Sequence, residues 1–198
     1  MYPKQFIALI ESLKILPSIG QKSATRMAFY LLEKNPKGAK NLIEQLRINL
    51  ENMRHCTLCR TLTDQVICEI CADTSRDKTR LCVVEHTADF HALEQLNIFN
   101  GYYYILHGYL SPLDGLGPDE LGLDQLRQQI LAAEVKELIL ATNPTVEGNA
   151  TAFYIQEIMH DLKDLKISRI AHGVPVGSSI ENLDGGTLFH AFNARQNL

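Results

Sequence analysis

Four of the five cysteines in this 198-residue chain fall in two closely spaced pairs, and no other feature constrains the fold as strongly. The spacing is Cys56-x2-Cys59-x8-Cys68-x2-Cys71. Each Cys-x2-Cys pair lets one tight turn present two thiolates to the same metal ion, and two such turns complete the tetrahedral four-sulfur shell of structural zinc. We therefore predict one structural zinc ion per chain, with no open coordination position for catalysis.

The spacing alone leaves three other uses of these thiols open: a redox pair, an iron–sulfur cluster, or unliganded core cysteines. Residues 55–78 are short and polar and lack the periodicity needed for a core of their own. Such a segment needs a crosslink or a metal to fold, which favours zinc. The fifth cysteine, Cys82, lies in an apolar run and is expected to be a small core residue. His55 adjoins a complete shell and is expected at the surface or beside the ligands.

Charge is divided unevenly along the chain, although the net charge is only −4. Residues 1–60 hold ten Lys and Arg against four Asp and Glu, which gives +6, whereas residues 61–198 hold nine against nineteen, which gives −10. A basic segment joined to an acidic body is typical of a chain that binds a polyanion through one end. The alternative is solvated surface charge, unevenly distributed, with no partner.

Within the basic segment, residues 16–24 join two predicted helices by a very short turn. Ile19 is expected to anchor this turn on the core, and Gly20 permits close approach to the first N–H groups of the next helix. Lys22 and Arg26 are four residues apart and share one face of that helix. Gly20, Lys22 and Arg26 thus form a candidate site for a DNA phosphate, without sequence preference. The alternative is an ordinary helical hairpin with a solvated basic face.

Beyond the cysteines, short apolar runs alternate with helical patterns. We predict strands at residues 81–84, 102–106, 138–141 and 167–171, and helices at residues 87–96, 120–134 and 149–162. This alternation is typical of βαβ units and a largely parallel sheet. A hairpin is expected in the turn-rich residues 173–186. The fold class is therefore α/β with several modules: N-terminal helices, a zinc ribbon and an α/β domain.

Several classes of protein are excluded by composition. With 45% apolar and 21% charged residues the chain is too apolar to be disordered. It has no run of about 18 apolar residues, so no membrane association is expected, and its N-terminus lacks the layout of a signal peptide. We expect a cytoplasmic protein without disulfides.

In this order, the motifs resemble the RecR family of recombination mediator proteins. The matching segments are residues 16–26, the four cysteines, and residues 81–85, 110–118, 141–148 and 171–177. The resemblance implies a helix–hairpin–helix region at residues 1–54, a zinc finger at 55–78, a Toprim domain at 79–174 and an oligomerisation tail at 175–198. One departure is Ser18, which stands where the family has the first glycine of the hairpin. Serine tolerates a positive φ poorly, so we expect an altered hairpin or a weaker hold on phosphate.

The resemblance also implies what the chain does. Members of this family are non-enzymatic DNA-repair proteins that act with RecO and RecF to load RecA on gapped or single-stranded DNA. They form a ring-shaped homotetramer in which neighbouring helix–hairpin–helix regions pack together, and the positions of Glu85 and Asp89 belong to an acidic face used with RecO. The apolar residues near the C-terminus are expected at a subunit contact; they are Leu188, Phe189, Ala191 and Phe192.

Toprim enzymes hold Mg²⁺ with one Glu after the first strand and an Asp-x-Asp pair after a later one. Glu85 fills the first role, but residues 143–148 read Asn-Pro-Thr-Val-Glu-Gly in place of Asp-x-Asp-x-x-Gly. Two carboxylates are lost from the cage, and Glu147 restores one at a different offset. We therefore expect no catalytic residue. A Mg²⁺-dependent Toprim nuclease or primase-like enzyme is the alternative, and weak Mg²⁺ binding at Glu85 and Glu147 stays open.

The remaining polar candidates are expected to be structural. His107 and His172 each precede a glycine near a predicted strand end, but no nucleophile pattern lies near either of them. Tyr102, Tyr103 and Tyr104 fall in an apolar run and are expected to serve packing rather than nucleophilic attack.

Overall fold

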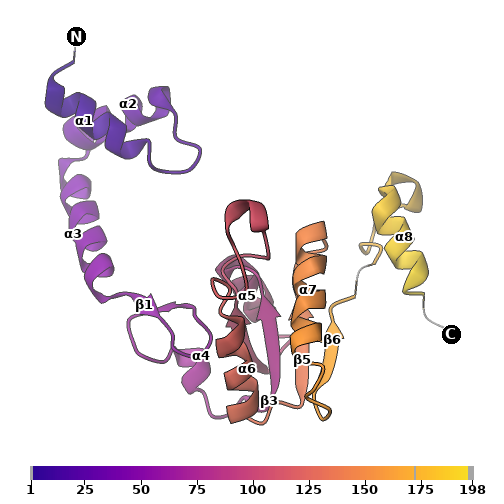
Figure 1. Cartoon of the computed structure of the whole chain (residues 1–198). Coiled ribbons are helices and arrows are strands. Elements are labelled where there is room, and N and C mark those ends of the chain that lie inside the picture. Colours follow the sequence, from indigo (N-terminus) through magenta and orange to yellow (C-terminus); the bar gives the residue numbers. More distant parts are fainter. Residues whose placement is uncertain (1, 172, 196–198) are drawn as a thin grey trace. The chain divides into compact units, whose positions relative to one another are not determined.

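A computed structural model of the chain describes residues 2–171 and 173–195. The chain divides into two compact units, Met1–Met53 and Arg54–Leu198, each described here by itself (Figure 1). The first unit is helical and the second is α/β, so the predicted fold class is confirmed. None of the described helices combines the length and the apolarity that a membrane span requires.

The N-terminal unit consists of three helices, and the first two of them share a very small core. They are α1 (Lys4–Leu13), α2 (Gln21–Phe29), which continues as a π-helical turn (Tyr30–Lys34), and α3 (Pro36–Asn52). Only Ile10, Ala24 and Ala28 form its buried centre, and Ile19 packs against them, as the sequence predicted. The Asn-Pro-Lys-Gly segment starts α3 rather than forming a loop, because the side chain of Asn35 accepts a hydrogen bond from the N–H of Gly38.

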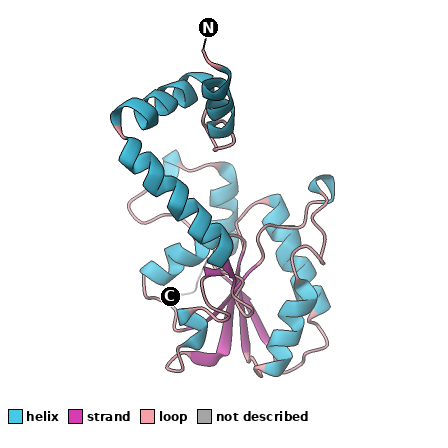
Figure 2. Cartoon of the chain, turned by 90° about the vertical axis from the view of Figure 1, so that its left-hand side faces the viewer, coloured by secondary structure: helices cyan, strands magenta, loops and turns pink. Residues whose placement is uncertain are grey.

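The second unit is built on a four-stranded parallel sheet, in agreement with the predicted βαβ pattern. Its strands are β3 (Asp77–Val84), β4 (Gly101–Ile105), β5 (Glu137–Ala141) and β6 (Lys166–Arg169), in the spatial order β4-β3-β5-β6. The connecting helices are α5 (Thr87–Gln95), α6 (Leu123–Ala132) and α7 (Val146–Ile158). Helices flank the magenta strands on either side in Figure 2.

The two faces of the sheet are covered differently. Leu81 and Val83 of β3 face a large apolar cluster that α6 and α7 complete. The alternate residues, Cys82 and Val84, face a second cluster with Phe90 of α5 and the four cysteines of the ribbon. A parallel sheet needs cover on both faces, and here the ribbon supplies part of that cover.

The ribbon is therefore packed into the same compact unit as the sheet. It contains a two-stranded antiparallel sheet, β1 (Arg54–His55) with β2 (Leu62–Thr63), followed by the short helix α4 (Glu69–Ala72). After β6, the described residues form a 3-10 turn (Ile180–Asn182) and α8 (Gly185–Asn193). The hairpin expected at residues 173–186 is wrong, because the apolar stretch there is short and Pro175 lacks the N–H that a strand pair needs.

Ser18 lies in the turn between α1 and α2 and has a left-handed backbone conformation. Its φ is +64°, in the left-handed region that glycine adopts without steric cost. The short turn between α1 and α2 thus imposes the hairpin geometry on a serine, and the local cost falls on the stability of the N-terminal unit.

We predict that Ser18→Gly raises the free energy of unfolding of the N-terminal unit by about 0.5–1 kcal/mol, since relief of the left-handed strain exceeds the entropy that glycine adds to the unfolded chain. Hydrogen exchange of the α1 and α2 amides in the full-length protein measures the change. Ser23→Gly, the same substitution inside α2, is the control and should cost about 0.5 kcal/mol. Equal shifts in the two variants would contradict the assigned strain.

Candidate functional site

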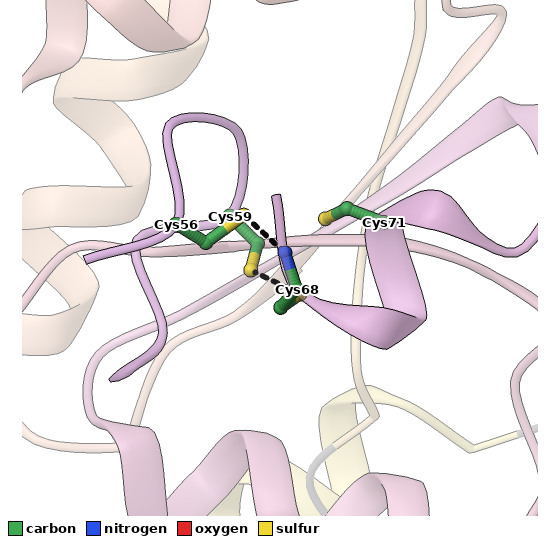
Figure 3. A group of neighbouring side chains, drawn as sticks. All are labelled: Cys56, Cys59, Cys68 and Cys71. Carbon is green, nitrogen blue, oxygen red and sulfur yellow. Dashed lines mark hydrogen bonds between the residues drawn. The ribbon is translucent and has the colours of Figure 1, made fainter. Parts of the chain in front are cut away.

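The four cysteines converge on a single buried point. Their Sγ atoms all lie within 4.8 Å of one another, and the four side chains are almost completely buried. Cys56 and Cys59 come from the turn after β1, whereas Cys68 and Cys71 begin and end one turn at α4 (Figure 3). None of the cysteines is in a disulfide. Four sulfurs at about 2.3 Å from a tetrahedral zinc ion lie about 3.8 Å apart, so this donor set fits zinc.

The electrostatics of the cluster call for a cation. The Sγ atoms of Cys59 and Cys68 are 3.4 Å apart, and this contact raises the pKa of Cys59 and lowers the pKa of Cys68. The hydrogen bond to Cys59 also raises the pKa of Cys71. Cys59 and Cys71 therefore hold their protons unless a metal replaces them, and zinc binding releases those protons. Within the described residues, no other group of three or more His, Cys, Asp or Glu side chains is arranged for a metal ion.

The first cysteine turn is bonded directly to the sheet. The carbonyl of Cys59 accepts a hydrogen bond from the N–H of Ile105, at 3.0 Å, at the end of β4. The guanidinium of Arg60 donates to the carbonyls of Leu106 and Leu121 and lies over the ring of Tyr104. The metal site is thus continuous with the hydrogen bonding of the sheet.

Two histidines near the ribbon, His55 and His107, contact the turn that joins the ribbon to the sheet. His55 Nδ1 and His107 Nε2 each lie 2.8 Å from the carbonyl oxygen of Arg60, so both rings donate to one acceptor. Burial lowers the pKa of His107, which keeps the ring neutral near pH 7. His107 is therefore a hydrogen-bonded structural residue, whereas His172 lies outside the described residues. Burial also raises the pKa of Cys82 to about 12, in keeping with a core thiol.

The carboxyl edge of the sheet brings Glu85 and Asn143 together from two adjacent strands. Glu85 is only 1% exposed. Its Oε1 accepts from the main-chain N–H of Asn143 at 2.9 Å, and its Oε2 accepts from the side-chain amide of the same residue. Glu147 is exposed in the first turn of α7 and does not join Glu85 in a metal-binding group. The residues in the Toprim position therefore do not fit a Mg²⁺ ion.

Glu85 and Asp89 do not form an exposed acidic pair. The expectation that both lie on a partner-facing surface is wrong for Glu85, because its carboxylate points inward to Asn143. Asp89 is half-buried, and its Oδ2 accepts a hydrogen bond from the N–H of His86, which caps α5. Of the two, Asp89 alone offers a carboxylate near the surface.

The turn between α1 and α2 leaves the first backbone N–H groups of α2 without a side-chain cap among the described residues. Gly20 precedes α2 in an extended conformation, with φ −92° and ψ 177°, and a Cβ there would meet no atom within 4 Å. No side chain caps α2 among the described residues, so the N–H groups of its first turn have no acceptor within the helix. Lys22 and Arg26 are exposed, and neither forms an ion pair with a described residue. The structure thus brings the three predicted residues to one end and one face of α2.

The apolar residues of α3 do not form a core. No residue of α3 is buried; Ile43 is 67% and Leu50 83% exposed. Leu42 also borders an apolar groove that Leu13, Leu16, Arg26, Met27, Tyr30 and Leu31 complete. The small size of the N-terminal unit was the signal that its helices have more apolar surface than they can bury.

Known families match the chain along almost its whole length. Residues 6–48 match the RecR helix-hairpin-helix family, residues 53–73 the RecR zinc finger domain of four cysteines, residues 79–171 the Toprim domain, and residues 173–196 the RecR C-terminal family. Among curated relatives, Recombination protein RecR of Saccharophagus degradans is 50% identical over 190 residues, which cover 96% of each chain. The proteins of that name from Halorhodospira halophila and Pseudomonas putida are 48% identical over 196 residues and 52% identical over 189. The match to the Halorhodospira protein covers 99% of this chain and 97% of the relative. The match to the Pseudomonas protein covers 95% of this chain and 94% of the relative.

We predict that Cys59→Ser abolishes stoichiometric zinc binding and lowers the midpoint of thermal unfolding by about 10 °C, corresponding to about 3 kcal/mol, because the ribbon covers one face of the sheet. Elemental analysis and calorimetry of the full-length protein measure both effects. Cys82→Ala is the control: this thiol is buried in the same cluster but lies outside the metal site. It should keep its zinc, and a zinc-free Cys82→Ala protein would contradict the ligand assignment.

Proposed function

Since the chain belongs to the RecR family of recombination proteins, we propose that it is a DNA-binding mediator of recombinational DNA repair with no catalytic activity of its own. The observation that carries the DNA-binding part is the free, uncapped start of α2 beside two unpaired cations. Backbone N–H groups at a helix N-terminus favour an anion, and Lys22 and Arg26 add positive charge on the same helix. Contacts of this kind reach phosphates and not base edges, so binding is independent of sequence.

The absence of catalysis is supported by the polar contacts of Glu85. Its carboxylate is buried and bonded to Asn143, and Glu147 is exposed in the first turn of α7. A two-metal or one-metal phosphoryl-transfer site needs several oxygen ligands that converge on open space. The alternative is a Mg²⁺-dependent Toprim nuclease or primase-like enzyme. Nucleic-acid cleavage or synthesis that Glu85→Gln abolishes would favour that alternative.

We further propose that the chain acts with RecO and RecF to load RecA on gapped or single-stranded DNA, as its family resemblance implies. Asp89 is the residue of the acidic pair with a carboxylate near the surface, and we assign it to the contact with RecO. Glu85 supports this contact indirectly: it is buried, and its hydrogen bonds fix the loop that starts at Asn143.

Self-association is supported by exposed apolar side chains at both ends of the chain. They lie along α3 and on α8, where Phe189 and Phe192 are exposed. Apolar surface of this extent is typical of a subunit contact. We propose a homotetrameric ring in which the helix–hairpin–helix regions of neighbouring subunits pack together. We also propose four functional regions, at residues 1–54, 55–78, 79–174 and 175–198.

For DNA binding, we predict that the double variant Lys22→Ala/Arg26→Ala lowers affinity on the order of tenfold at low salt, equally for unrelated sequences. The slope of log affinity against log salt should become shallower by about one per residue removed. Fluorescence anisotropy with labelled single-stranded and gapped DNA measures both quantities.

The control for this experiment is Lys78→Ala/Lys163→Ala, which removes the same charge from exposed positions of the acidic C-terminal unit. It should leave both affinity and salt slope within error of the wild type. Equal losses in the two double variants would mean that net charge, rather than the hairpin, determines binding.

For the partner contact, we predict that Asp89→Asn weakens binding to RecO at least about tenfold while DNA binding and thermal stability stay unchanged. Asparagine keeps a side-chain oxygen that accepts from the His86 N–H, so the start of α5 is preserved. Asp124→Asn, in the first turn of α6, is the matched control and should bind RecO normally. Isothermal calorimetry measures the affinities, and unchanged RecO binding by Asp89→Asn would remove this residue from the contact.

A further inference from the structure

The centre that corresponds to the Toprim metal site holds a buried carboxylate, and no group of three or more metal-binding side chains is found there among the described residues. Glu85 follows β3, the strand next to β5 in the sheet, and its side chain is almost wholly buried. A carboxylate taken out of water is costly unless a cation or hydrogen-bond donors replace the water. Hydrogen-bond donors of the protein must therefore replace the water around this carboxylate.

Asn143 supplies two donors to Glu85, one for each oxygen. Its main-chain N–H reaches Oε1, and its side-chain amide reaches Oε2. A carboxylate only accepts hydrogen bonds, so the amide must turn its NH₂ group toward Glu85. An aspartate at position 143 would instead place a second acceptor against the first, and the pair would need a proton or a cation between them.

Arg169 fixes the loop that carries Asn143. This residue ends β6, and its guanidinium donates to the side chain of Asn149 and, at 3.3 Å each, to the Thr142 hydroxyl and the Asn143 carbonyl. Burial lowers the pKa of Arg169, and the nearby charge of Glu85 opposes that effect. A single cation thus holds both ends of the segment between β5 and α7.

The space beside Glu85 is filled by main chain. A Cβ built on Gly148 would clash with the Asn143 carbonyl oxygen and would lie 2.6 Å from Glu85 Oε1. The N–H of Gly148 is also bonded within its own turn, to the Thr145 hydroxyl. The main chain at Gly148 therefore leaves no room for a further atom between it and this oxygen while the loop keeps this conformation.

We propose that Asn143 replaces the divalent cation of a Toprim centre, and that Arg169 acts as a positioning residue that holds the Asn143 loop closed on Glu85. The carboxyl edge of β3, β5 and β6 then keeps one geometry at any Mg²⁺ concentration. The proposal concerns this centre alone and does not depend on DNA or RecO binding, so either can fail without the other.

The decisive variant is Asn143→Asp in the full-length, zinc-loaded protein. In a chelator that spares zinc, its midpoint of thermal unfolding should fall by about 5 °C or more, because two carboxylates then face each other. Added Mg²⁺ should restore most of that loss, whereas the wild type should show no Mg²⁺-specific shift against NaCl of equal ionic strength.

Two further variants separate this role from a merely structural one. Asn143→Ala loses the side-chain donor without adding a charge, so it should be destabilised and Mg²⁺ should not restore it. The exchange Glu85→Gln/Asn143→Asp keeps both hydrogen bonds with one of them reversed, since the glutamine amide donates to the new aspartate. This double variant should be more stable than Asn143→Asp without Mg²⁺ and should not respond to the ion.

The exchange also covers the case in which Asn143→Asp does not fold, because the double variant should then recover a folded protein. Three results would overturn the proposal: Asn143→Asp with wild-type stability and no Mg²⁺ response, a wild type that Mg²⁺ stabilises as much as it stabilises the variant, or an exchange variant no more stable than Asn143→Asp.

Discussion

The contact between the four-cysteine turns and the sheet is the interaction on which the C-terminal unit depends. Helices α6 and α7 cover one face of a parallel sheet, but α5 alone leaves the other face partly open. The ribbon covers the rest of this face. The cysteines of the ribbon lie in the same cluster as Tyr103 and Ile105, and the Cys59 carbonyl accepts a hydrogen bond from the end of β4. A segment too short to form a core thus contributes to the core of its neighbour, provided that a metal holds its two turns together.

The carboxyl ends of all four strands are engaged by internal polar contacts. In open α/β sheets this edge is the usual place for a ligand. Here the end of β4 meets the Arg60 turn of the ribbon, and the ends of β3, β5 and β6 meet one another through Glu85, Asn143 and Arg169. Donors that an enzyme would leave for its substrate or metal are used within the protein. This edge is therefore suited to a surface of fixed shape.

Local patterns in the sequence predicted the elements well and their surroundings less well. The strands are found within about four residues of the predicted ends, and the cysteine spacing correctly predicted one closed metal site, because both depend on short-range geometry. The exposure of the apolar residues of α3 follows from no local pattern, since burial depends on what packs against a helix. Glu85 was expected on a partner-facing surface because the family resemblance implied an acidic face there, and Asn143 was counted only as a lost ligand. No local pattern states that an amide two strands later in the chain will bond to a carboxylate.

In the function proposed above, DNA binding and subunit assembly depend on each other because both involve the N-terminal unit. Helices α1 and α2 share a core of Ile10, Ala24 and Ala28, while Ile43 and Leu50 of α3 are exposed. A unit with so little buried apolar surface gains stability when another subunit covers the rest. The hairpin that carries Gly20, Lys22 and Arg26 also contains the left-handed Ser18, whose strain must be balanced by this small core. Subunit contacts that stabilise α1 and α2 therefore stabilise the conformation that presents the phosphate donors, so the assembled protein holds its DNA-binding hairpins more firmly than a single chain does.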